Sequence, residues 1–359
     1  MTPIGIYIHV PFCARKCPYC DFYSCAYDLT AAEKYTDAVI RDIKNLPDNI
    51  YADTLYFGGG TPSLLSADML NKILDALSHH CHFINPEITL EVNPCTVTEE
   101  KLFQYSKIGI NRLSFGVQSV HNDELKFLGR MHSWEKAEKI INSAQNIGFK
   151  NISCDIMIGL SGQSIEKLKL TIHKIAELSI QHFSAYILKI EENTPFNTPD
   201  IINSLPDDDH ISDLYLFMAE ELQKLGYNQY EISNFSKMGF ESKHNLKYWK
   251  CQEYIGLGPS AHSYFNGKRY FIPSDLNKYL NSTETILTDE NPGSDDEKIM
   301  LGLRLTEGIN INDFPSRKAL FLEKAKVFNK FNLIEIKNNF IKLTPKGFLV
   351  SNSIINEFI

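Results

Sequence analysis

The first 190 residues alternate between short apolar segments and longer segments with apolar side chains at helical spacing. The short segments are rich in β-branched and aromatic residues, which is typical of buried strands. Strands that alternate with helices predict βαβ units and a parallel sheet. We therefore expect strands in six segments, which are residues 4–10, 53–60, 87–94, 111–119, 151–160 and 182–190.

Several helices between these strands have recognisable ends. Thr30 and Glu33 have the spacing of a capping box, and Ser66 precedes the next helical stretch. Gly148 suits the left-handed residue that often follows the last turn of a helix. Six βα units in about 190 residues predict an α/β fold with a partial (β/α)6 TIM-type barrel; a doubly wound open sheet is the alternative.

The pattern changes after the predicted barrel. Residues 241–290 are rich in aromatic side chains and show no regular period. From about residue 292, two helical stretches precede a hairpin pattern, which predicts a small winged-helix-like α+β domain. We expect three parts: a barrel over residues 1–240, an irregular connecting segment over 241–290 and a C-terminal winged-helix-like domain over 291–359.

The composition and charge of the chain argue against some classes of partner and location. The chain has 359 residues, a hydrophobic content of 43% and a formal net charge of −8. The acidic balance and the lack of long Lys/Arg runs argue against a nucleic-acid partner. No apolar run is long enough for a transmembrane helix, and the N-terminus lacks the pattern of a signal peptide. We expect a cytoplasmic protein with reduced thiols, in which clustered cysteines bind a metal.

Half of the eight cysteines lie in the segment "CARKCPYCDFYSC". Cys13, Cys17 and Cys20 have the spacing C-x3-C-x2-C. Three thiolates can hold three corners of a [4Fe–4S] cube, which leaves the fourth iron open to a small chelating molecule. In the alternative, Cys25 is a fourth ligand, either for a closed electron-transfer cluster or for zinc. The remaining cysteines are scattered and are expected to be structural; they are Cys81, Cys95, Cys154 and Cys251.

Polar groups stand at or near the ends of the predicted strands. The glycines of "FGGGTP" let a ligand approach the backbone, whose N–H groups can bind a carboxylate. Glu91 and Asp155 suit an amino group or ribose hydroxyls, Arg130 suits a carboxylate, and Gln118 ends the fourth strand. Each residue alone also fits an ordinary surface or core role. Because barrel strands end on one face, these groups would meet, and S-adenosylmethionine (SAM) carries the matching chemistry.

The combined motifs resemble the radical SAM superfamily. More narrowly, "YIHVPFCARKCPYCDF", "FGGGTPSLL", "EVNP", "FGVQS", "LGRMH" and "DIMIGLSGQS" are similar to the HemN/HemW group, which includes the oxygen-independent coproporphyrinogen III oxidases. The resemblance covers nearly the whole chain and implies a barrel of the radical SAM type, a [4Fe–4S] cluster on Cys13, Cys17 and Cys20, and one or two bound SAM molecules. The SAM contacts that it implies are Tyr7, Tyr19, Gly59, Gly60, Thr61, Glu91, Gln118, Arg130 and Asp155, with Lys189 as a weaker candidate.

One position and one segment separate the branches of this group. The oxidase branch continues C-x3-C-x2-C-x-C, and this chain has Phe22 in place of the last cysteine. The segment "HNLKYW" resembles the H-N-x-x-Y-W motif of the haem-chaperone branch. That resemblance implies haem b as cargo, unidentified haem-acceptor proteins as partners, and room for transient membrane contact. It also implies haem contacts at His244, Tyr248 and Trp249, with His262 weaker.

Alternatives remain at this point. Without the resemblance, "HNLKYW" fits a structural segment with a hydrogen-bonded histidine. An oxidase that decarboxylates coproporphyrinogen III and a radical SAM enzyme with another substrate are both open, although Phe22 argues against the oxidase. Whether the chain is an enzyme therefore stays open, as does its oligomeric state.

Overall fold

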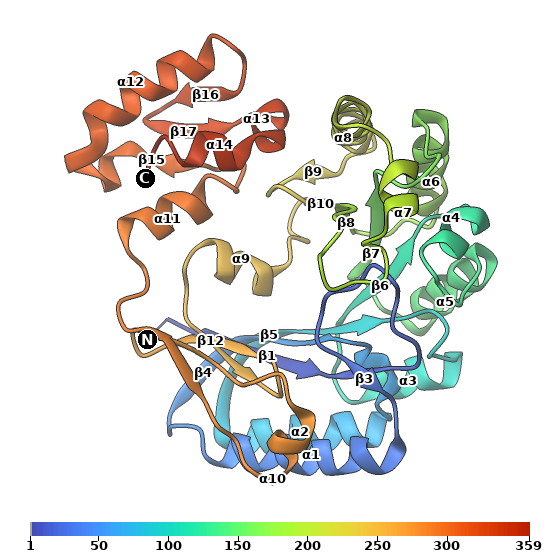
Figure 1. Cartoon of the computed structure of the whole chain (residues 1–359). Coiled ribbons are helices and arrows are strands. Elements are labelled where there is room, and N and C mark those ends of the chain that lie inside the picture. Colours follow the sequence, from blue (N-terminus) through green and yellow to red (C-terminus); the bar gives the residue numbers. More distant parts are fainter. Residues whose placement is uncertain (1) are drawn as a thin grey trace.

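The structure is a computed structural model that describes residues 2–359, and its centre is a large mixed sheet (Figure 1). The sheet has twelve strands in the order β14-β13-β12-β11-β1-β4-β5-β6-β7-β8-β10-β9. Its six middle strands run parallel and in chain order, which confirms the predicted partial (β/α)6 barrel. These strands are β1 (Ile4–Val10), β4 (Ile50–Gly59), β5 (Cys81–Val92), β6 (Arg112–Gln118), β7 (Ile152–Ile158) and β8 (His182–Ile187).

Helices cover the outer face of these strands (Figure 1). On β1, Ile4, Ile6, Ile8 and Val10 belong to the main hydrophobic core, together with apolar side chains of the helices. The residues between them therefore face the barrel interior, because side chains alternate along a strand. The covering helices are α1 (Leu29–Lys44), α2 (Ala67–His80), α3 (Glu99–Lys107), α4 (Asn122–Phe127), α5 (Trp134–Ile147), α6 (Ile165–Glu177) and α8 (Asp208–Lys224).

Two of the three predicted helix ends are confirmed. The Ser66 side chain accepts a hydrogen bond from the Met69 backbone N–H at the start of α2, and Gly148 ends α5 with φ 113°. The capping box at Thr30 is wrong. Helix α1 begins at Leu29, because the Asp28 carboxylate accepts a hydrogen bond from the Ala31 N–H and caps the helix two residues earlier.

The segment 241–290 is more regular than expected. It extends the main sheet, since β11 (Tyr254–Leu257) lies parallel to β1 and β12 to β14 follow outward from it. Asn266 and Gly267, with φ 51° and 69°, form the turn between β12 and β13. An Asn-Gly pair is a strong hairpin signal in sequence, and the prediction of an irregular segment did not take it into account. The other elements are α9 (Lys243–Trp249), β12 (His262–Phe265), β13 (Lys268–Phe271), α10 (Leu276–Asn281) and β14 (Ile286–Asp289).

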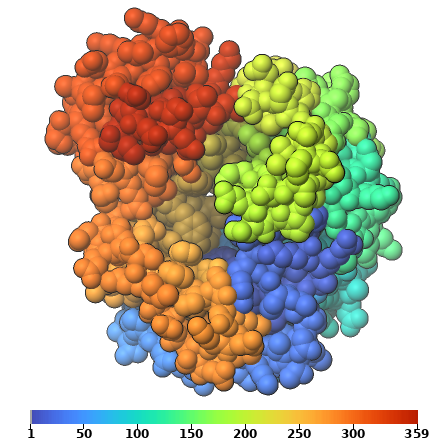
Figure 2. All heavy atoms as spheres, in the orientation of Figure 1, coloured from blue at the N-terminus to red at the C-terminus, as the bar shows by residue number. Residues whose placement is uncertain are grey.

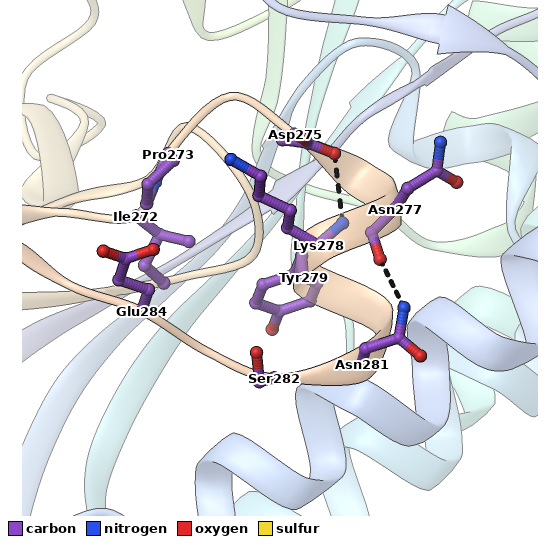
Figure 3. A pocket seen from close by; sticks show the side chains of 9 residues that line it. All are labelled: Ile272, Pro273, Asp275, Asn277, Lys278, Tyr279, Asn281, Ser282 and Glu284. Atoms are coloured by element: carbon purple, nitrogen blue, oxygen red, sulfur yellow. Dashed lines mark hydrogen bonds between the residues drawn. The ribbon is translucent and has the colours of Figure 1, made fainter.

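Helix α10 and the loop before it surround a pocket of about 360 Å³ (Figure 3). Two of its side chains are engaged in the helix itself. Asp275 accepts a hydrogen bond from the Lys278 backbone N–H, and the Asn281 side chain donates to the Asn277 carbonyl oxygen.

The C-terminal part contains helices and a hairpin, as predicted. Strands β15 (Ile309–Asn310), β17 (Phe340–Leu343) and β16 (Ile334–Lys337) form a separate antiparallel sheet. The helices are α11 (Asp295–Gly302), α12 (Lys318–Asn329), α13 (Pro345–Leu349) and α14 (Ser351–Ile355).

Two small strands lie between β1 and α1, and further small elements follow β8. They are β2 (Phe12–Cys13), β3 (Cys25–Ala26), α7 (Pro199–Ser204), β9 (Asn228–Gln229) and β10 (Asn234–Ser236). The surface is hollowed between the orange-to-red C-terminal part and the yellow-green segment near residue 200 (Figure 2). Within residues 2–359, no helix combines the length and the apolar character needed to cross a membrane.

Candidate functional site

A pocket of about 370 Å³ lies where the cysteine loop meets the C-terminal ends of the barrel strands. This is the face at which barrel enzymes build their sites. Most residues predicted from the sequence line it. They are Cys13, Cys17, Tyr19, Cys20, Gly59, Gly60, Thr61, Glu91, Gln118, Arg130 and Asp155.

The three spaced cysteines share the pocket, and none of them is fully buried. The Thr61 hydroxyl donates to the Cys13 Sγ at 3.5 Å, and the Arg130 Nη1 donates to the Cys17 Sγ at 3.5 Å. Within residues 2–359, no three His, Cys, Asp or Glu side chains are grouped to hold a single metal ion. A [4Fe–4S] cube does not need such a group, because each thiolate binds a different iron.

Cys25 stands apart from this pocket. Cys25 pairs with Phe12 where the short strands β2 and β3 lie side by side, and its Sγ donates to the Pro11 carbonyl oxygen at 3.1 Å. Cys25 is not among the residues that line the pocket. The arrangement favours three thiol ligands over four.

Two glycines let the loop after β4 lie close to the cysteine loop. A Cβ on Gly60 would lie 2.7 Å from the Phe12 carbonyl oxygen. At Gly59 the backbone has φ 106°, and a Cβ would lie 2.7 Å from the His9 ring. No side chain fits at either position without a shift, so the backbone itself forms this wall of the pocket.

Arg130 has an unused donor beside the thiols. Its Nη2 donates to the Gly116 carbonyl oxygen at 2.7 Å, which fixes the guanidinium. Its Nε is buried and has no hydrogen-bond partner among the described residues. Leaving a buried donor unpaired is costly, so the side chain fits a bound carboxylate, such as that of SAM.

Two carboxylates face the pocket from neighbouring parts of the sheet. Glu91 accepts hydrogen bonds from the Tyr56 hydroxyl at 2.8 Å and from the Gly59 N–H at 3.2 Å. Burial raises the pKa of Glu91 to about 7, against the opposing effect of the Tyr56 hydrogen bond. Burial also raises the pKa of Asp155, which accepts from the Ser114 hydroxyl at 3.1 Å. Buried carboxylates of this kind can accept hydrogen bonds from an amino group and from ribose hydroxyls.

Gln118 reaches the pocket through an irregular strand end. It has φ 71°, in the left-handed region, and the pairing of β6 with β7 shifts register between Gly116 and Gln118. A strained residue at a bulge re-aims its side chain, which is common at functional sites.

Two predicted SAM contacts lie elsewhere. Tyr7 is not among the pocket-lining residues; its hydroxyl lies 3.1 Å from the His9 Nδ1. Lys189 is also outside the lining, and its exposed Nζ forms an ion pair with Glu191 at 2.8 Å. In contrast, Tyr186 lines the pocket and was missed, although its place at the end of β8 is the same signal that identified Glu91.

The "HNLKYW" segment forms α9, and its histidine is not open to a ligand. His244 is 1% exposed; its Nδ1 lies 2.8 Å from the Thr54 Oγ1 and its Nε2 lies 2.7 Å from the Tyr248 hydroxyl. Burial, with the nearby charges of Lys247 and Arg112, lowers the pKa of His244 to about 3. Both ring nitrogens are already hydrogen-bonded in this conformation, so the surroundings of His244 give no support to haem ligation, which stays a prediction.

Trp249 points to a different place. It lines a separate pocket of about 560 Å³, which also includes Phe314 and Phe340 of the C-terminal part. The Arg304 guanidinium lies 5.8 Å from its ring centroid. The structure does not bring His244 and Trp249 together around one ligand and instead favours the structural interpretation of the motif.

Comparisons with known proteins agree with this geometry. The Radical SAM superfamily matches residues 7–175, and the HemN C-terminal domain matches residues 296–350. A protein named "Heme chaperone HemW" from Lactococcus lactis is 33% identical over 99% of this chain and 97% of its own length. The protein of the same name from Bacillus subtilis is 32% identical over 98% of both chains.

Among solved structures, coproporphyrinogen III oxidase (HemN) from Escherichia coli, a radical SAM enzyme, has the same fold. The TM-score is 0.80 with 21% identity, over 99% of this chain and 90% of that one. Radical SAM proteins carry a [4Fe–4S] cluster and SAM, and the pocket contains suitable groups for both. On full-length similarity above 30% identity, the chain belongs to the HemW family of radical SAM proteins.

Proposed function

We propose that this chain is a haem chaperone, which binds haem b and transfers it to acceptor proteins. In this proposal, Cys13, Cys17 and Cys20 hold a [4Fe–4S] cluster, and SAM binds beside it. The observation that supports the proposal is the combination of full-length similarity to proteins named haem chaperones with a pocket that gathers the three thiols and the strand-end polar groups.

The chemistry of each pocket residue suggests which part of the cluster or of SAM it would contact. Thr61 and Arg130 would stabilise the thiolates of Cys13 and Cys17 by donating to sulfur. The unpaired Nε of Arg130 would hold the SAM carboxylate, which the bare backbone at Gly59 and Gly60 lets approach. The N–H groups of these two glycines already donate to Glu91 and to the Val10 carbonyl oxygen, so they do not take the carboxylate role expected from the sequence. When bound, the cluster supplies the electron for any reductive cleavage of SAM.

The remaining polar side chains suit the other parts of SAM. Glu91 would bind the amino group, while Asp155 and Gln118 would bind ribose hydroxyls. Tyr19, packed at 6.0 Å from the Phe196 ring, would form an apolar side of the pocket. These assignments leave Lys189 without a role in SAM binding, since its charge is paired at the surface.

Phe22 weighs against the oxidase alternative. Its side chain is 69% exposed at the rim of the pocket and cannot bind iron. The oxidase branch has a cysteine at this position. A haem chaperone releases its haem chemically unchanged, so it does not need the additional cysteine of the oxidase branch.

One anaerobic experiment tests the function. The full chain is reconstituted with iron and sulfide, titrated with haem, and followed by the Soret absorption. We expect near-stoichiometric binding and transfer of the haem to an apo-haem protein such as apomyoglobin. Addition of SAM, a reductant and coproporphyrinogen III should give no protoporphyrinogen. Formation of that product, or the absence of haem binding, would overturn the proposal.

A further inference from the structure

A ring of α9 and two rings of the barrel strands pack together, and we call them the aromatic cluster: His244, Tyr7 and Tyr56. We call the pocket of about 370 Å³ beside the cysteine loop the SAM pocket, after its proposed ligand. The His244 ring lies 5.2 Å from the Tyr56 ring at 28°, and 6.2 Å from the Tyr7 ring at 29°. The Tyr7 and Tyr56 rings lie 6.1 Å apart at 33°. Each ring thus packs on the other two in a nearly parallel arrangement, so a shift of one disturbs its neighbours.

The strands are shaped to hold these rings. Tyr7 and Tyr56 are direct partners across β1 and β4, so their side chains leave the sheet on the same face. A Cβ on Gly5 would lie 3.0 Å from the His244 ring, and one on Gly58 would lie 2.9 Å from the Tyr56 ring. The two glycines therefore provide the space that the aromatic cluster fills.

Helix α9 is fixed to β4, to the residue before β1 and to the neighbouring strand β5. The Lys247 Nζ forms an ion pair with Asp53 at 2.8 Å and donates to the Pro3 carbonyl oxygen at 2.8 Å. The Lys243 backbone N–H donates to Glu87 at 3.0 Å. With the Thr54 contact to His244, these bonds give the histidine ring one defined position.

The aromatic cluster reaches the SAM pocket through a single hydrogen bond. The Tyr56 hydroxyl donates to one oxygen of Glu91 at 2.8 Å, and the other oxygen accepts from the Gly59 N–H at 3.2 Å. A buried carboxylate held by two donors keeps one orientation, and losing a donor leaves it free to turn.

A second connection reaches the cysteine loop. The Tyr7 hydroxyl lies 3.1 Å from the His9 Nδ1, and the His9 Nε2 lies 3.0 Å from the Tyr23 carbonyl oxygen. Tyr23 lies between Cys20 and Cys25 in the sequence. The aromatic cluster is therefore connected both to Glu91 and to the cysteine loop.

We propose that His244 is a positioning residue for SAM binding: it fixes Tyr56, and Tyr56 orients Glu91 toward the SAM amino group. This inference rests on the proposed role of Glu91 in binding SAM. It gives the "HNLKYW" helix a task inside the barrel that is distinct from haem ligation.

The test measures SAM affinity of the reconstituted full chain under anaerobic conditions, together with the EPR spectrum of the reduced cluster with and without SAM. Tyr56→Phe removes only the hydroxyl and retains the stacked ring. We expect it to weaken SAM binding by about tenfold, the effect of losing a hydrogen bond to a charged group. His244→Ala should give a similar loss and a smaller SAM-induced EPR change, with the cluster content and haem stoichiometry of the parent.

Two further variants separate positioning from general damage. His244→Gln retains a polar group within reach of the Tyr248 hydroxyl and should recover part of the affinity. His79→Ala removes an exposed histidine of α2 and should leave SAM binding unchanged.

Each outcome decides a specific point. SAM affinity within twofold of the parent in Tyr56→Phe would overturn the inference, even if His244→Ala fails to fold. Loss of haem binding in His244→Ala with unchanged SAM affinity would also overturn it and identify His244 as a haem ligand. A parent protein that binds neither cluster nor SAM would instead refute the proposed function.

Discussion

The SAM pocket and the α9 helix differ in how completely their polar groups are satisfied. In the pocket, the Nε of Arg130 is buried without a partner, and the cysteine thiols are partly accessible. In α9, both nitrogens of His244 are hydrogen-bonded and the side chain is 1% exposed. Both regions contain residues that the sequence motifs identified as candidates for function. The structure distinguishes the two regions, because a donor without a partner can still bind a ligand, whereas a group that is already hydrogen-bonded stabilises the fold.

The largest expected effect concerns the thiols. Cys13→Ser should abolish the iron–sulfur absorption of the reconstituted protein, because an alcohol is a poor ligand for a cluster iron. Cys25→Ser is the matched control and should retain the spectrum, since the Cys25 Sγ donates to a backbone carbonyl oxygen outside the pocket. Iron and sulfide content provide the measurement. Equal loss in both variants would restore Cys25 as a fourth ligand and remove the contrast with the pocket thiols.

The next effect tests the open donor. Arg130→Lys retains the charge but loses the planar guanidinium, so we expect SAM binding to weaken by about 10- to 100-fold. Calorimetry on the reconstituted protein measures this change. Lys189→Ala is the control with an exposed cation already paired to Glu191, and its SAM affinity should equal that of the parent. A stronger effect at Lys189 than at Arg130 would contradict the placement of the site.

These cases show which parts of the site were predictable from sequence. Glu91 and the glycines, at strand ends, and Asp155, within the fifth strand, were predicted to meet from the alternation of strands and helices, because parallel barrel strands all end on one face. The burial of His244 did not follow, since it depends on contacts with Thr54 and on the space left by Gly5. Such contacts join residues about 190 to 240 positions apart, and local periodicity carries no record of them.

The fold shows the same division. The six parallel strands were predicted because each combines burial with β-branched composition, whereas β11 to β14 were missed because they are short strands. The Asn266-Gly267 turn was a usable signal for one of their hairpins. At α1, Asp28 and Thr30 both suited an N-cap, and only the path of the chain selects the aspartate.

The pH dependence of SAM binding tests the electrostatics of the pocket. Because burial raises the pKa of Glu91 to about 7, the carboxylate is ionised above that pH and protonated below it. The N–H groups of the SAM amino group donate to the ionised form, so SAM affinity should fall as the pH is lowered. Between pH 8 and 6 we expect a loss of about tenfold, as one ionisable group with this pKa dictates. Tyr56→Phe removes a hydrogen bond that lowers the pKa, so its midpoint should move to higher pH. A flat profile in the parent would exclude Glu91 as the partner of the amino group.

The smallest expected effect concerns the hydrogen bonds of His244 in α9. Thr54→Val replaces a hydroxyl by a methyl group of similar shape and leaves the Nδ1 of His244 buried without its partner. We expect the free energy of unfolding of the cluster-free protein to fall by about 1–3 kcal/mol, measured by urea denaturation. Thr285→Val changes an exposed threonine and should alter stability by about 0.5 kcal/mol or less. If Thr54→Val is as stable as the parent, His244 does not depend on this bond. Its ring would then be free to turn toward a ligand, and the distinction between a satisfied helix and an open pocket would fail.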